Sequence, residues 1–184
     1  YAPDWRHNEV IFVAIRNGSY DIYAVNPQTG IERQLTDDSY IDSNPVWSPD
    51  GQYFAYQSYR EEGQAIFVAA ADGRNAVQLT SGAGNNFNPI WSPDGRYIAF
   101  ISQRDGNEEL YLVNPTDPES VQRLTTHPAE DRAPVWSPDS KYLAFVSYRD
   151  RNAEIYLLNI KSGTLMRVTD HPGEDLFPAW HPWI

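Results

Sequence analysis

The sequence predicts an all-β fold, a β-propeller of four-stranded blades with about four blades in the chain. A Trp-Ser-Pro-Asp motif recurs at spacings of 44 and 45 residues, and short aromatic and β-branched runs alternate with turn motifs. No stretch of ten or more residues shows helical periodicity without Pro or Gly. A period near 44 residues is that of one propeller blade, whereas a β-sandwich has no reason to repeat and a β-helix coil is about half as long.

The repeated motif fixes the register of the repeats. It begins at Trp47, Trp91 and Trp136, with a weaker copy at Trp180. A proline stands two residues before each tryptophan, at Pro45, Pro89, Pro134 and Pro178. Pro3 and Trp5 form a degenerate fifth copy at the start of the chain.

Each repeat supplies short strands in a fixed order. In the second repeat, apolar runs occupy 53–56 and 66–68, with Asp50-Gly51 as a hairpin-type turn before the first run. We therefore predict a single domain over 1–184. Its repeats are expected at approximately 1–46, 47–90, 91–135 and 136–179, with a C-terminal closing strand at 177–184.

Four blades are the lower limit for a propeller. An unclosed arc would expose apolar blade faces and open strand edges. The ring is therefore expected to close within this chain, to be completed by a second chain in a homodimer, or to belong to a longer propeller. Either the closing strand or Pro3–Trp5 is expected to complete the first blade.

Composition excludes several classes of protein. The 184 residues include 14 basic and 25 acidic side chains, a net charge of −11, and no cysteine. A disulfide scaffold, cysteine-ligated zinc and thiol catalysis are excluded. The acidic balance argues against nucleic acid and anionic membranes as partners. No window resembles a membrane span, and no signal peptide is present in the given chain.

Two repeated columns are interpreted as structural. The tryptophans are expected to pack between blades, with each indole N–H finding one partner. An arginine follows the first apolar run of each repeat, at Arg16, Arg60, Arg104 and Arg149. Acids stand five residues later at Asp21, Glu109 and Glu154, whereas Ala65 breaks the pattern. Paired charges are the expected role of this column, with an anion-binding arginine cluster as the alternative.

The loop before each tryptophan carries the candidate binding residues. Five residues before each tryptophan stand Asp42, Asn86, Asp131 and Asp175. If these side chains ring one mouth of the central channel, their oxygens could hold Ca²⁺. The alternative is that they accept backbone N–H bonds where the loop enters the strand, so that no cofactor binds. The third and fourth copies share His-Pro-x-Glu-Asp, which adds His127, Glu130, His171 and Glu174 to the candidates.

One repeat resembles a known family closely. Its pattern is Pro-x-Trp-Ser-Pro-Asp-Gly, then Tyr-Ile-Ala-Phe-x-Ser-x-Arg-Asp-Gly-x-x-Glu-Leu-Tyr (89–111), then Arg-Leu-Thr (123–125). It is similar to the WD-repeat-like, PD-type repeat of the TolB β-propeller family. That resemblance implies the propeller fold over nearly the whole chain. The family includes periplasmic TolB, which binds the lipoprotein Pal, gating domains of peptidases, and oligogalacturonate lyases with a His-rich metal site.

The function is harder to infer from the sequence than the fold, because one fold is used for many functions. Nothing in the 184 residues resembles a peptidase domain, the TolB N-terminal domain or the lyase His cluster. We therefore expect a non-catalytic scaffold that binds a protein or ligand, located outside the cytoplasm in the periplasm or secreted. The alternatives are a hydrolase or lyase acting on saccharide or peptide at the channel mouth, and a structural fragment of a larger propeller protein.

Overall fold

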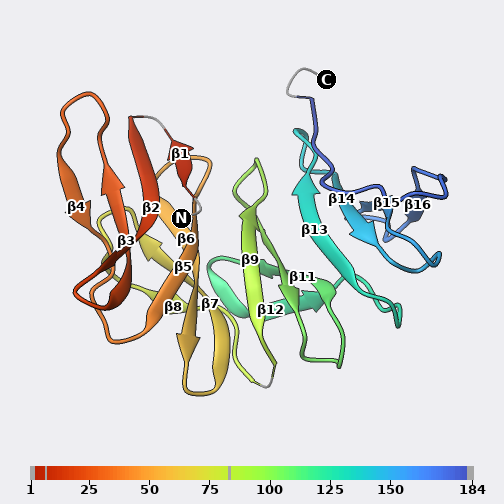
Figure 1. Ribbon diagram of the computed structural model, residues 1–184, viewed down its shortest axis with the longest axis horizontal. Helices are drawn as coiled ribbons and strands as arrows, with labels where there is room; N and C mark the ends of the chain where they lie inside the picture. The colour runs from red at the N-terminus through yellow and green to blue at the C-terminus, as the bar shows by residue number, and fades with distance from the viewer. Residues whose placement is uncertain (1–2, 7, 83, 182–184) are drawn as a thin grey trace.

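The protein folds into four separate four-stranded antiparallel sheets that follow one another along the chain (Figure 1). The computed structural model describes residues 3–6, 8–82 and 84–181, and no helix occurs among them. Correspondingly, no helix in this part of the chain is long and apolar enough to cross a membrane. The predicted all-β propeller with four four-stranded blades is confirmed.

Each blade uses its strands in sequence order from the inside outward. Blade 1 contains β1 (Asp4–Arg6), β2 (Glu9–Arg16), β3 (Ser19–Val25) and β4 (Glu32–Gln34). Blade 2 contains β5 (Ile41–Trp47), β6 (Tyr53–Arg60), β7 (Gly63–Ala70) and β8 (Val77–Gln78). Blade 3 contains β9 (Asn86–Trp91), β10 (Ile98–Ser102), β11 (Glu109–Asn114) and β12 (Asp117–Arg123). Blade 4 contains β13 (Asp131–Trp136), β14 (Tyr142–Ser147), β15 (Glu154–Asn159) and β16 (Leu165–Arg167).

The hydrophobic core lies between the blades. One cluster joins Ile11 and Ile22 of blade 1 to Phe54 and Phe67 of blade 2. Equivalent clusters join blade 2 to blade 3 and blade 3 to blade 4. The middle strands are covered on both faces, which explains their continuous apolar runs, as in the fully buried β10.

The motif after each tryptophan is a turn, as its composition suggests. In blade 2, the Ser48 hydroxyl donates to Asp50 at 2.6 Å and accepts from the N–H of Tyr53 at 3.0 Å. Gly51 closes the turn on the carbonyl of Ser48 with a positive φ of 69°, a conformation that suits glycine. The same serine–aspartate bond recurs at Ser92 and Ser137.

The prolines before the tryptophans mark a bulge in the inner strands of blades 2, 3 and 4. The register of β5 on β6 shifts between Ser43 and Val46, and Asn44 there has a φ of +48°. Asn88 and Ala133 occupy the same column with φ values of 53° and 49°. A proline is tolerated directly after the bulge residue, because the hydrogen-bond ladder is interrupted there and does not require a backbone N–H from that residue.

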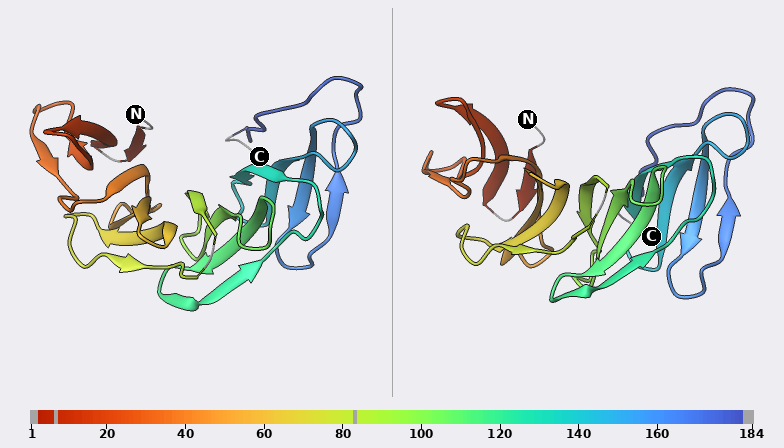
Figure 2. Two further views of the ribbon diagram at one scale, coloured as in Figure 1. Left: turned by 60° about the horizontal axis from the view of Figure 1, so that its bottom comes forward. Right: turned by 90° about the horizontal axis from the view of Figure 1, so that it is seen from below.

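The four sheets form an arc with an open side between blades 1 and 4 (Figure 2). A ring closed by this chain alone, one of the predicted alternatives, is therefore not observed. β1 pairs with β2 and supplies the inner strand of blade 1, so Pro3–Trp5 and not the C-terminal segment fills that place. Of the expected closing strand, residues 177–181 form no strand, and 182–184 lie outside the described residues.

Candidate functional site

The polar residues that stand five positions before each tryptophan, here called the polar column, lie at the start of the inner strands. Asp42, Asn86 and Asp131 lie at or next to the first residue of β5, β9 and β13 and are all at most 1% exposed. The Ser58 hydroxyl donates to Asp42. Arg104 Nη2 donates to Asn86 at 2.8 Å, and Arg149 Nη2 donates to both oxygens of Asp131 at 2.9 and 3.1 Å.

These hydrogen bonds direct the side chains of Asp42, Asn86 and Asp131 into their blades. The three side chains are buried and bonded to the second strand or the residues after it, whereas a calcium site needs their oxygens around one point. Burial raises the pKa of Asp131 and raises that of Asp42 to about 6, against the hydrogen bonds from Ser147 and Ser58 that act in the opposite direction. Asp175, the fourth member, is partly buried, and its N–H donates to the carbonyl of Ala153 at 2.8 Å.

The four arginines bind other partners than those the sequence suggested. Arg104 and Arg149 bind the inner-strand polar column, whereas Arg16 pairs with Glu32 and Arg60 pairs with Asp38 at 2.9 Å. Each guanidinium also lies over an aromatic ring of the third strand, such as Arg149 over Tyr156 at 4.6 Å.

The acids at the start of the third strand reach outward, to the fourth strand. Glu109 accepts from Arg123 Nη2 at 3.0 Å and from the Thr125 hydroxyl. Glu154 accepts from Arg167 Nη2 at 2.8 Å, and Asp21 accepts from Gln34 at 3.2 Å. In blades 3 and 4 the arginine after the second strand thus binds the inner strand and the acid of the third strand binds the fourth strand, so the two do not pair with each other.

The tryptophans lie at the blade interfaces. Trp47 belongs to the cluster between blades 1 and 2, and Trp136 to a cluster between blades 3 and 4. The indole N–H of Trp136 donates to the carbonyl of Ile90 at 3.3 Å. The buried indole nitrogens of Trp47 and Trp91 have no hydrogen-bond partner among the described residues, so the expected single partner is not general.

The His-Pro-x-Glu-Asp loops are held by two asparagines that were not predicted from the sequence. Asn107 Nδ2 donates to the carbonyl of His127 at 2.9 Å, and Asn152 Nδ2 donates to that of His171 at 2.7 Å. Each imidazole Nδ1 accepts a backbone N–H two residues on, from Ala129 at 3.1 Å and from Gly173 at 3.0 Å. The shared Asn two residues before Glu109 and Glu154 was the available sequence signal.

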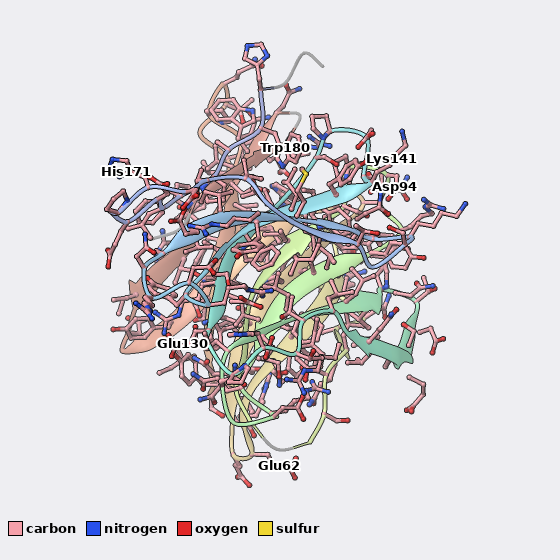
Figure 3. The ribbon with its side chains drawn as sticks, turned by 90° about the vertical axis from the view of Figure 1, so that its right-hand side faces the viewer. Glu62, Asp94, Glu130, Lys141, His171 and Trp180 are labelled. Carbon is pink, nitrogen blue, oxygen red and sulfur yellow. The ribbon has the colours of Figure 1, made fainter. Side chains whose placement is uncertain are left out.

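The two loop acids differ in their contacts. Glu130 forms an ion pair with Arg132 at 2.7 Å, and Glu174 is exposed. Figure 3 places Glu130 and His171 on one side of the molecule and Asp94 and Lys141, from the turns after the tryptophans, on the opposite side. In the part of the chain that the structure describes, no three His, Asp or Glu side chains are grouped so that they could hold a metal ion.

The inner-strand bulge, the serine–aspartate turn and the inter-blade tryptophan define a repeat β-propeller protein. A family model described as the dipeptidyl peptidase IV N-terminal region matches residues 103–184. The Tol-Pal system protein TolB of Desulfosudis oleivorans is 33% identical over 66 residues, 36% of this chain and 15% of TolB. Together with the structural similarity described next, these matches confirm the TolB-like β-propeller relationship.

Solved structures extend the similarity to nearly the whole chain. A TolB-type structure from Agrobacterium tumefaciens has a TM-score of 0.74 and 28% identity, and the match covers 87% of this chain and 60% of that one. An oligogalacturonate lyase in complex with manganese has the same TM-score at 19% identity, covering 92% of this chain and 52% of the lyase, which shows the fold alone. The chain thus spans less than two thirds of the length of each relative named here.

Proposed function

We propose that this TolB-like propeller is a non-catalytic scaffold that binds a protein partner. The observation that carries the proposal is that Asp131, one of the candidate binding residues, is fully buried, with its carboxylate paired to the guanidinium of Arg149 and its N–H bonded to the carbonyl of Glu108 in blade 3. His127 and Glu130 beside it are also engaged, in a turn and in an ion pair. A repeated residue whose side chain is bonded within the chain in this way is expected to stabilise its blade.

The proposed contact surface is an apolar groove between blades 2 and 3. It has a volume of about 360 Å³ and lies on the side of the turns that follow the tryptophans. Its apolar lining includes Pro49, Tyr53, Val68, Val77, Trp91 and Pro115. Tyr53 is 47% exposed and Val77 46% exposed, and large exposed apolar side chains around a hollow are typical of protein-binding sites.

Tyr53 and Tyr59 give a matched test, because they lie at opposite ends of β6 and are 47% and 45% exposed. The immobilised full chain would be exposed to extracytoplasmic extract of the host, and retained proteins identified by mass spectrometry. We expect a specific protein to be retained by the parent chain and by Tyr59→Ser but not by Tyr53→Ser. Identical retention on all three chains would overturn the groove as the binding surface.

The same proposal includes the cellular location of the protein and its oligomeric state. The similarity to TolB proteins supports a place outside the cytoplasm, in the periplasm or secreted. The open side of the arc supports completion of the ring by a second copy of this chain. Light scattering of the purified chain tests this, with a dimer expected and a clean monomer contradicting it.

The competing proposal is a hydrolase or lyase active at the loops that carry His127, Glu130, His171 and Glu174. It is supported by the exposure of His171 and Glu174, by the partial exposure of His127 and Glu130, and by enzymes among the proteins of this fold. If saccharide or peptide turnover is detected, replacing Asp131 and Asp175 by Ala should abolish it. Turnover that survives both substitutions would overturn this alternative.

A further inference from the structure

Blade 2 departs from the other blades at one buried position. Near the start of the third strand, blades 1, 3 and 4 have an acid at this position: Asp21, Glu109 and Glu154. Blade 2 has Ala65 there instead. In blades 3 and 4 the acid is fully buried and has two recurring donors: an arginine of the fourth strand and a threonine hydroxyl. The asparagines Asn107 and Asn152 add a third donor.

The donors of this site persist in blade 2 without the acid. Thr80, 1% exposed, accepts from the N–H of Ile66 at 2.9 Å, as the threonines of the other blades do from their third strands. Its hydroxyl hydrogen has no acceptor among the described residues. Gln78 replaces the arginine: its Nε2 donates to the carbonyl of Thr80 at 2.7 Å, which leaves a second N–H for another acceptor.

The place of the missing carboxylate is a pocket of about 310 Å³. Ala65, Gln78 and Thr80 line it, together with Arg60 and Asn86. Arg60 brings the positive charge. Its guanidinium is stacked on Tyr40 at 4.0 Å and on Phe67 at 4.5 Å, and its buried Nε has no partner among the described residues. Its Nη1 is already paired with Asp38 at 2.9 Å, so Nε is the atom that it offers to the pocket. The pocket therefore offers the Arg60 Nε–H and two further unused donors around the space that a glutamate fills in blades 3 and 4.

The rim of the pocket has the opposite charge. Glu61 and Glu62 line it and are exposed, and Glu62 lies at the lower edge of the molecule in Figure 3. An anion without a positive group would be repelled at the entrance, whereas an ammonium group beside the carboxylate would be attracted there.

We propose that this pocket of blade 2 binds a small zwitterion of the amino-acid type. Its carboxylate takes the position of the missing glutamate, against Thr80, Gln78 and Arg60, and its ammonium group lies toward Glu61 and Glu62. The site is independent of the proposed protein-binding groove, which lies between blades 2 and 3 on the side of the post-tryptophan turns.

Ala65→Glu is the decisive variant, because it restores within blade 2 the carboxylate that blades 3 and 4 contain. We expect it to fold with unchanged or raised thermal stability, since Thr80 and Gln78 gain an acceptor. The tethered carboxylate should abolish ligand binding by filling the site. Thr80→Val removes one donor and should weaken binding about tenfold.

The probes are glycine, acetate and methylammonium, titrated into the full chain and followed by the amide NMR signals around Ala65. We expect saturable shifts with glycine, weaker ones with acetate and none with methylammonium, all lost in Ala65→Glu. No shift with glycine, equal binding of methylammonium, or full binding of glycine to a folded Ala65→Glu chain would each overturn the proposal.

Discussion

Trp180 donates its indole N–H to the carbonyl of Val135 at 3.3 Å, the bond that Trp136 makes to Ile90 one blade earlier. The backbone agrees: Phe177 has a φ of 56° and Ala133 one of 49°, each followed by proline. Among the described residues no second strand pairs with 175–180. Segment 175–180 therefore shares an indole hydrogen bond and a positive φ with the inner strand of blade 4, although it pairs with no second strand among the described residues.

The two tryptophans should differ in their contribution to stability. Trp136 is 8% exposed within a cluster, so Trp136→Ala should lower the free energy of unfolding by about 3–5 kcal/mol. Trp180 is only partly buried, and Trp180→Ala should cost less than about 2 kcal/mol. Urea unfolding followed by circular dichroism measures both. Equal losses would show that Trp180 is packed as tightly as Trp136.

The ion pair of Arg149 with Asp131 supports a second prediction. Arg149→Ala leaves a buried carboxylate without its counter-ion, and such a change typically costs about 3–5 kcal/mol. Adding Asp131→Asn to this variant should recover much of the loss, because the neutral amide tolerates burial, as Asn86 does in blade 3. The same unfolding measurement applies. A double variant no more stable than Arg149→Ala would contradict this explanation.

The period and turn chemistry were enough to predict the blades, because Trp-Ser-Pro-Asp and the apolar runs encode local structure. The direction of Asp42 and Asp131 was not predictable by counting from the tryptophan. Side chains alternate along a strand, but the bulge between Ser43 and Val46 inserts a residue and changes that alternation. The partners of Arg104 and Arg149 were missed for a related reason, since they depend on which neighbouring strand each side chain faces.

Calcium should not stabilise the chain, because the oxygens expected to bind it are buried within separate blades. Ca²⁺ requires about six to eight oxygen ligands around one point. Asp42, Asn86 and Asp131 already have partners in their own blades. We expect no heat on titration and no change in melting temperature at about 1 mM Ca²⁺. A rise in melting temperature that Asp131→Asn removes would reinstate the calcium site.

Asp42 should make stability depend on pH. Burial raises its pKa to about 6, from an ordinary value of about 3.9, so the folded state binds this proton more tightly than the unfolded state. Its contribution to stability is therefore complete below about pH 4 and is lost as the pH rises through about 6. For a shift of about two units, the loss is roughly 3 kcal/mol.

Asp42→Asn removes that titration, and the next blade already carries asparagine at the equivalent Asn86. We expect the variant to be more stable than the parent chain at pH 7.5, with the difference shrinking toward pH 4. Urea unfolding across this range measures it, and Asp37→Asn, at an exposed position, serves as the control. A variant whose advantage does not change with pH would show that the proton on Asp42 is not the cause. Loss of stability at every pH would show instead that Ser58 requires a carboxylate partner.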